Sequence, residues 1–189
     1  MKKGDIYNGF LVLDVQEIPF LKATGIWCRH EKTKMEVFHL LNDDSENLFA
    51  YGFKTLPTNS KGTAHILEHS VLCGSKNYPL KDPFIRLSNQ SVKTYLNALT
   101  FPDKTVYPGS SQVEKDYFNL MSVYGDAVFF PELKPEIFMQ EAHHLEVDEK
   151  GEFSIQGVVF IELKGSYLIY EIVIFVKLFV FLLSIISYV

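Results

Sequence analysis

The sequence predicts an α+β fold, in which an antiparallel meander of strands is followed by helices and hairpins. Residues 9–18 and 35–41 are rich in β-branched and apolar side chains, and the second segment ends at the polar turn 42–44, which is typical of strands. Residues 111–114 (SQVE) form a capping-box sequence, and apolar residues follow it at helical spacing up to Pro131. Strands early in the chain and helices later therefore indicate a mixed class.

The remaining elements are predicted from local patterns of the same kind. We expect Thr63 to cap a helix that ends near Gly74, and the Asp82-Pro83 pair to open a second helix. A shorter helix is expected to begin at Pro135. Further strands are expected at residues 27–29, 48–53, 95–100, 105–107, 145–147 and 153–155, the last four forming two hairpins.

Composition and charge restrict the functional class. With 189 residues, of which 47% are hydrophobic, the chain is long enough to bury a full core. The formal net charge is −5 and the basic residues form no long run, so nucleic acid is not expected as a partner. Cys28 and Cys73 are too few for a secreted disulfide framework and lack metal-ligand spacing, which indicates a reducing compartment. No targeting segment precedes the first strand, which predicts a cytoplasmic location for the chain as written.

The residues with the clearest chemistry lie in the sequence HILEH, residues 65–69. On a helix, His65 and His69 lie one turn apart on one face and can direct imidazole nitrogens at one metal ion. Glu68 lies on the neighbouring edge of that face, within reach of a metal-bound water. HxxEH reverses the commoner HExxH order of zinc peptidases. Zinc lowers the pKa of its water to about 7, and such a glutamate transfers the water's proton to a leaving amine.

The motif alone leaves two interpretations open: half of a zinc site, or two ordinary histidines on a helix surface. A catalytic zinc needs a third protein ligand and an open position. The downstream candidates are Glu141, Glu146 and Glu162. Glu162 lies in an apolar segment, and a buried carboxylate needs a partner such as a metal ion, which favours this residue.

Residues 95–100 (YLNALT) predict a strand next to the motif helix. If its edge is exposed, this strand is able to bind an extended peptide by β-augmentation, and Asn97 and Ala98 would lie on that edge. The alternative is an ordinary sheet strand without a binding role.

Several of these segments together resemble the pitrilysin-type metalloproteases, and more narrowly their presequence protease and falcilysin branch. The segments that carry the resemblance, which extends over residues 9–165, are GTAHILEHSVLCGS (62–75), YP (78–79), DPF (82–84), YLNALT (95–100), FMQEAHHLE (138–146) and GVVFIELKG (157–165). The resemblance implies a zinc-dependent endopeptidase that encloses unstructured peptides in a chamber made by two halves of a longer chain. It also implies an α+β domain, as in mitochondrial processing peptidase, with helices packed on one face of an antiparallel sheet.

The resemblance assigns roles to particular residues of this chain. It implies that the zinc ligands are His65, His69 and Glu162, with one Zn²⁺ per domain. It implies that Glu68 is the general base of catalysis.

The positions that hold the substrate backbone in this family are matched by Asn97 and Ala98.

In two respects the chain departs from the family pattern. Ile161 replaces the asparagine that usually precedes the distal glutamate, which predicts altered surroundings for Glu162. The C-terminal half that completes the chamber has no counterpart here, so the chain resembles an N-terminal fragment. The alternative function is therefore a catalytically incompetent fragment or paralogue that binds zinc and peptide or a partner subunit.

The composition changes abruptly near residue 166, which divides the chain into an incomplete N-terminal metallopeptidase domain, 1–165, and an apolar tail, 166–189. Three interpretations of the tail are open: a product of truncation or misjoining, a membrane anchor, or a buried terminal helix. About 20 residues span a bilayer, but Glu171 and Lys177 oppose insertion. A membrane partner is expected only through this tail. The family resemblance implies the mitochondrial matrix or a related organelle.

Overall fold

The structure, a computed structural model, describes residues 1–81 and 83–166, and these form two compact units that meet in the chain between Glu46 and Asn47. The predicted tail and Asp82 lie outside the described residues, so the boundary at 165/166 stays a prediction. Among the described residues no helix has the length and apolar character needed to span a membrane.

The first unit is a four-stranded antiparallel sheet in the order β1-β2-β3-β4. Its strands are β1 (Ile6–Tyr7), β2 (Phe10–Ile18), β3 (Ala23–His30) and β4 (Glu36–Leu41), with a 3-10 turn at Pro19–Leu21. The predicted strands 9–18 and 35–41 are confirmed. The strand β3 is longer than the predicted 27–29, because Ala23, Thr24 and Gly25 give no apolar alternation but pair with β2, and Thr24 and Gly25 pair with β4 as well.

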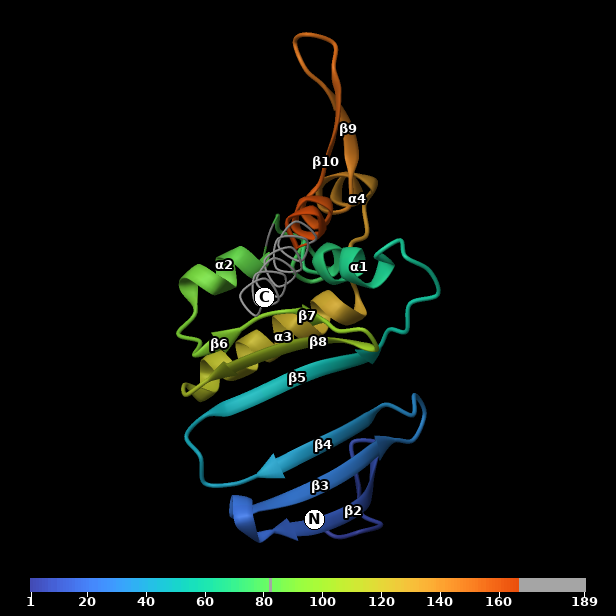
Figure 1. Ribbon diagram of the computed structural model, residues 1–189. Coiled ribbons are helices and arrows are strands. Elements are labelled where there is room, and N and C mark those ends of the chain that lie inside the picture. The colour runs from blue at the N-terminus through green and yellow to red at the C-terminus, as the bar shows by residue number, and fades with distance from the viewer. Residues whose placement is uncertain (82, 167–189) are drawn as a thin grey trace, which may run out of the picture. The chain divides into compact units, whose positions relative to one another are not determined.

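The second unit contains a sheet with strand order β5-β8-β6, and β7 also pairs with β8 (Figure 1). The strands are β5 (Asn47–Lys54), β6 (Tyr95–Leu96), β7 (Leu99–Thr100) and β8 (Lys104–Ser111). The helices are α1 (Thr63–Val71), α2 (Pro83–Gln90), α3 (Glu114–Phe129) and α4 (Pro135–Glu141). A hairpin of β9 (His144–Val147) and β10 (Phe153–Gln156) projects from this unit, and residues 158–166 are helical (Figure 1).

The core of this unit lies between the β5–β8 pair and the helices. Phe49 pairs with Gly109, and Tyr51 pairs with Tyr107, so Phe49 and Tyr107 point to the same face of the sheet. On that face the two aromatic residues join Val71 of α1 and Leu120 of α3 in one buried cluster. The prediction of an antiparallel sheet with helices packed on one face is therefore confirmed.

Two predicted helix caps are wrong. The N-cap of α1 is Gly62 in the left-handed conformation (φ 68°), not Thr63, because a β-branched residue is strained there. The N-cap of α3 is Val113 rather than Ser111, and the Ser111 hydroxyl instead accepts a hydrogen bond from the Val113 amide at 3.2 Å. The last residue of α1 is Val71 and its C-cap is Leu72, so Gly74 lies two residues beyond the cap.

Candidate metal centre

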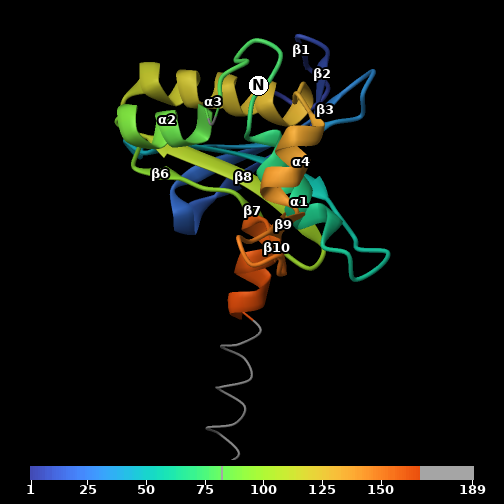
Figure 2. The ribbon, with the colours of Figure 1, turned by 90° about the horizontal axis from the view of Figure 1, so that it is seen from above.

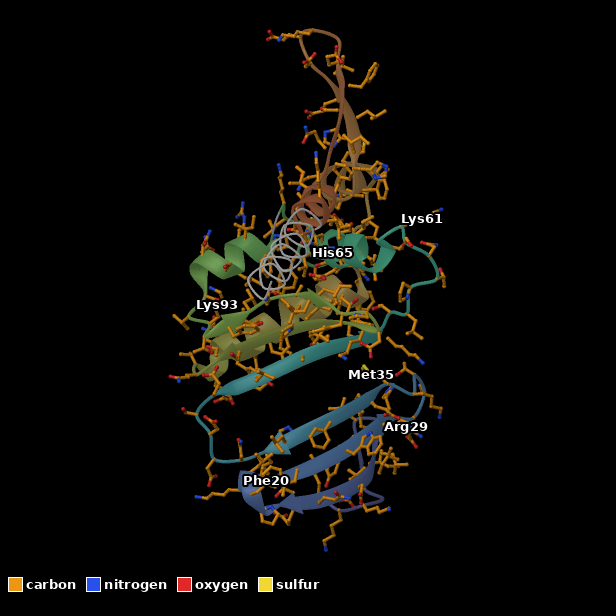
Figure 3. All side chains as sticks on the ribbon, viewed as in Figure 1. Phe20, Arg29, Met35, Lys61, His65 and Lys93 are labelled. Carbon is orange, nitrogen blue, oxygen red and sulfur yellow. The ribbon has the colours of Figure 1, made fainter. Side chains whose placement is uncertain are left out.

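The helix α1 presents both histidines of the motif on one face. The rings of His65 and His69 lie 5.0 Å apart between centroids, as expected for side chains one turn apart. Both rings are partly exposed, at 26% and 21% of their side-chain surface. Figure 3 labels His65 on α1, and Figure 2 shows α1 next to α4. The sequence prediction that the two imidazoles share a face is confirmed.

A glutamate far along the chain meets these histidines. Glu162 lies on the helical segment 158–166, and its Oε2 is 3.3 Å from His65 Nε2 and 3.5 Å from His69 Nε2. One ligand atom from each of the three residues lies within 4.8 Å of the other two. The expectation that the Glu162 carboxylate is buried is wrong, since 49% of its side chain is exposed. The approach of the chain is apolar, but the side chain of Glu162 itself is about half exposed to solvent.

Two of the three separations between ligand atoms fit the coordination shell of zinc. Tetrahedral ligands at 2.0–2.1 Å from Zn²⁺ are separated from each other by about 3.3 Å. The nitrogen–oxygen distances of 3.3 and 3.5 Å from Glu162 to the two histidines are close to this value. Two imidazoles and one carboxylate are also a ligand set of catalytic zinc, which leaves a fourth position for water or substrate.

Gly157 allows the chain to return from the β9–β10 hairpin to this cluster. Its φ is +152°, and a Cβ at this position would lie 2.2 Å from the carbonyl oxygen of Ala142. Only glycine permits this close approach, after which the helical segment begins and places Glu162 one turn later.

Glu141 orients His69 from the other side of the ring. Its Oε2 lies 3.2 Å from His69 Nδ1, and only 6% of the residue is exposed. Because a carboxylate accepts hydrogen bonds and does not donate them, Nδ1 carries the proton and Nε2 is free for a metal. The second oxygen of Glu141 accepts from Gln140 Nε2 at 2.7 Å, and the Cys73 thiol lies 3.6 Å from it.

The hydrogen bond between these two residues also changes their titration. It raises the pKa of His69, an effect that burial opposes and that the charges of Glu162, Glu141 and Glu68 reinforce. The same hydrogen bond lowers the pKa of the Glu141 carboxyl, although burial works in the opposite direction. Glu141 is therefore ionised wherever His69 is able to bind a metal.

Glu68 is buried on α1, with 6% of its surface exposed. Its charge acts on two buried tyrosines of the core, Tyr107 and Tyr124. Burial raises the pKa of both tyrosines, and the Glu68 charge raises each pKa further. The Glu68 charge also raises the pKa of His69, so the buried carboxylate lies close enough to act on both the histidine and the core tyrosines.

The other candidate ligands are not part of the cluster. Glu141 contacts Nδ1 of His69 and not the side where the Nε2 atoms converge. Glu146 lies on β9 and pairs with His144 at 3.1 Å. Among the described residues, His65, His69 and Glu162 are the group that could hold a metal ion.

Asn97 and Ala98 lie between β6 and β7. Both of these strands pair with β8, on the side of β8 opposite to β5. Both residues are half-buried, and β7 packs against α1. The Asn97 side-chain oxygen accepts a hydrogen bond from the Ala98 amide at 2.9 Å. The predicted edge position is therefore observed, while the role in substrate binding stays a prediction.

Sequence reasoning missed the orienting role of Glu141 and the tyrosines around Glu68. Glu141 was a candidate ligand because of its residue type, and only the geometry distinguishes contact with Nδ1 from contact with a metal. Tyr107 and Tyr124 follow apolar patterns that indicate core positions, and no sequence signal connects them to Glu68.

A helix with HxxEH, a converging distal glutamate and an α+β scaffold together define the class of inverted-motif metallopeptidases. The sequence profile of the insulinase family, peptidase family M16, matches residues 52–155. The chain therefore belongs to this family, and its relatives place it in the presequence protease branch.

Individual relatives agree with this assignment. The chain is 47% identical over 169 residues to "Protein HypA" of Clostridium perfringens, covering 88% of this chain and 17% of that protein. It is 44% identical over 168 residues to the mitochondrial presequence protease of Xenopus tropicalis, covering 87% of this chain and 16% of that protein. The crystal structure of pitrilysin shares the fold, with a TM-score of 0.59 and 22% identity over 69% of this chain and 14% of that chain. The chain thus spans about one sixth of the length of these two curated relatives.

Proposed function

We propose that this chain carries the zinc centre of a metalloendopeptidase that hydrolyses peptide bonds in short unstructured peptides. The observation that carries the proposal is the convergence of His65 Nε2, His69 Nε2 and Glu162 Oε2. Membership of the peptidase family supports a protease, and the ligand set supports zinc.

The proposed chemistry divides the work between the metal and the chain. When bound, zinc lowers the pKa of water to about 7 and polarises a carbonyl oxygen. His65, His69 and Glu162 hold the ion, and Glu141 fixes the ring of His69. Glu68 acts as general base: its carboxylate accepts a proton from the attacking water and then donates it to the leaving amine. Burial of Glu68 away from water strengthens these charge interactions.

The proposed substrate site is the strand edge at Asn97 and Ala98. An extended peptide added to this edge would form main-chain hydrogen bonds that do not depend on its sequence. Such binding favours an extended, unfolded segment, because most strands of a folded protein are already paired within their own sheets. The name of the presequence proteases among the relatives supports the same substrate class.

Zinc content and cleavage of an unstructured peptide by the full chain test the proposal, with Glu68→Gln as the decisive variant. We expect one zinc per chain in both proteins and loss of at least about 100-fold in kcat for the variant. Equal zinc content is the control that the variant keeps its centre. Turnover that does not change in Glu68→Gln would refute the assignment of the base.

A second function is favoured by the length of the chain relative to its relatives. The relatives are about six times longer, so the chamber of the whole protease would need residues beyond those matched here. We propose as the alternative a fragment or paralogue that binds zinc and a peptide or partner subunit without hydrolysis. Zinc binding and saturable peptide binding without turnover dependent on Glu68 would select this alternative.

We also propose two alternatives for the cellular compartment of the chain. The mitochondrial presequence proteases among the relatives support a mitochondrial or related organelle, whereas the bacterial relative comes from a cell without such organelles, so the cytoplasm is the alternative. Imaging of the tagged chain in its own cells separates the two.

A further inference from the structure

The strand β8 lacks one backbone hydrogen-bond donor where it runs beside Asn97. The strands β6 and β7 follow one continuous register against β8, since Leu96 pairs with Gly109 and Leu99 pairs with Val106. This register places Asn97 opposite Pro108. The interruption between β6 and β7 is therefore not a shift of register, and its cause lies in the Asn97–Pro108 pair.

The two residues form a hydrogen-bonded pair with one bond instead of two. The Asn97 amide donates to the Pro108 carbonyl at 3.2 Å. In an antiparallel ladder the opposite residue normally returns a bond from its own amide. Proline has no amide hydrogen, so the carbonyl of Asn97 receives nothing from β8.

A tyrosine of α3 supplies a donor to this carbonyl. The Tyr124 hydroxyl donates to Asn97 O at 3.4 Å. Tyr124 is only 1% exposed, and its ring packs edge-on against Phe49 at 5.9 Å between centroids. The aromatic ring is thus fixed by the core, and its hydroxyl reaches the strand from the helix-covered face.

We propose that Tyr124 is a positioning residue that replaces the missing Pro108 donor and holds Asn97 in the strand conformation needed for peptide binding at Ala98. The inference rests on the proposed function of this edge. Because backbone groups alternate along a strand, the groups of Asn97 face β8 and those of Ala98 face the free edge. An Asn97 carbonyl without a partner would rotate and carry the Ala98 peptide group with it.

The arrangement has a benefit that a regular ladder lacks. The Asn97 side chain accepts a hydrogen bond from the Ala98 amide at 2.9 Å and so covers the outward donor of the edge. Covered donors protect an edge strand from pairing with other chains. An incoming peptide exchanges this side-chain acceptor for its own carbonyl, which Tyr124 permits by keeping the backbone in place.

The test uses Tyr124→Phe, Pro108→Ala and the double variant in the full chain. Tyr124→Phe removes the hydroxyl alone and is expected to speed hydrogen exchange of the Asn97 amide by about 2- to 12-fold, the ratio that corresponds to one net hydrogen bond. KM for an unstructured peptide should rise by a similar factor, while kcat and zinc affinity stay within about twofold. Pro108→Ala provides an amide to Asn97, so the double variant should recover the exchange rate and KM of Pro108→Ala.

Tyr117→Phe is the matched control, because it removes a hydroxyl from the same helix. Equal exchange and KM in Tyr124→Phe and Tyr117→Phe would overturn the proposal, and so would failure of Pro108→Ala to restore the double variant. If Tyr124→Phe alone does not fold, equal exchange in Pro108→Ala and the double variant supports the proposal, and faster exchange in the double variant overturns it. If the wild-type chain cleaves no peptide, the proposed function fails, while amide exchange still decides the role of Tyr124.

Discussion

Replacing Glu141 by glutamine is expected to weaken zinc binding by about 10- to 100-fold, or about 1.4–2.7 kcal/mol. The carboxylate is 6% exposed and lies 3.2 Å from His69 Nδ1, where it fixes the proton and makes Nε2 a better ligand. Glutamine has the same shape but no charge, and its amide is able to donate to Nδ1 and so place the imidazole proton on Nε2. The variant therefore removes the orientation of the ligand without opening a cavity.

Competition with a chromophoric chelator measures the zinc dissociation constant of the full chain and of each variant. Glu146→Gln is the matched control, since Glu146 also pairs with a histidine, His144, at 3.1 Å but lies on β9 outside the cluster. The control should bind zinc as the wild type does. An unchanged dissociation constant in Glu141→Gln would refute the view that Glu141 prepares His69 for the metal.

Three further predictions concern stability and the path of the chain to Glu162. Leu120→Ala should lower the free energy of unfolding in urea by about 2–5 kcal/mol, because Leu120 is fully buried in the core. Burial raises the pKa of Asp126, but the Ser75 hydroxyl beside it and hydrogen bonds from Asn77 at 2.8 and 2.6 Å outweigh this, so its pKa lies below the ordinary value of an aspartate. Asp126 therefore stabilises the fold above its unfolded pKa, and this stability is lost as the pH falls through the folded pKa. The difference in Tm between the wild type and Asp126→Asn should therefore shrink on acidification. Gly157→Ala should weaken zinc binding, because the new Cβ would meet the carbonyl of Ala142.

Each of these predictions has a result that contradicts it. Phe118→Ala, at a position 55% exposed, is the control for the core, and an equal loss in both variants would mean that α3 does not pack as described. A Tm difference for Asp126→Asn that stays constant with pH would exclude a lowered carboxyl pKa. Gly151→Ala, at a turn with open space around its Cβ position, is the control for Gly157→Ala, and equal zinc affinity in the two variants would contradict the role of the close approach.

The part of the site that lies on one helix could be predicted from the sequence. The spacing of His65 and His69 determines that their rings share a face once the segment is helical, and α1 confirms this. Glu162 is separated from His69 by many residues, so no local period connects them, and the prediction depended on its apolar surroundings and on the family resemblance. The exposure of its carboxylate could not be predicted, because it depends on how residues 158–166 return to α1.

The secondary structure, too, could be predicted only where a local sequence pattern determines it. Segments rich in β-branched and apolar residues, such as β2 and β4, were predicted to within about a residue, because these residue types favour strands even where, as in β4, every side chain is exposed. The caps of α1 and α3 were wrong, because the chain enters each helix through a backbone conformation that side-chain type does not reveal. Asn97 and Pro108 are ordinary residues in the sequence, and only the register shows that they face each other.

X-ray absorption at the zinc edge of the full chain, loaded with one equivalent of zinc, tests the central claim most directly. We expect one tightly held zinc per chain, with two imidazole nitrogens and carboxylate or water oxygens at about 2.0–2.1 Å and no sulfur ligand. The Glu162→Gln variant should lose affinity while keeping both imidazoles. A sulfur ligand at about 2.3 Å, or zinc that is retained equally after His65 and His69 are both replaced by alanine, would contradict the assignment of the site.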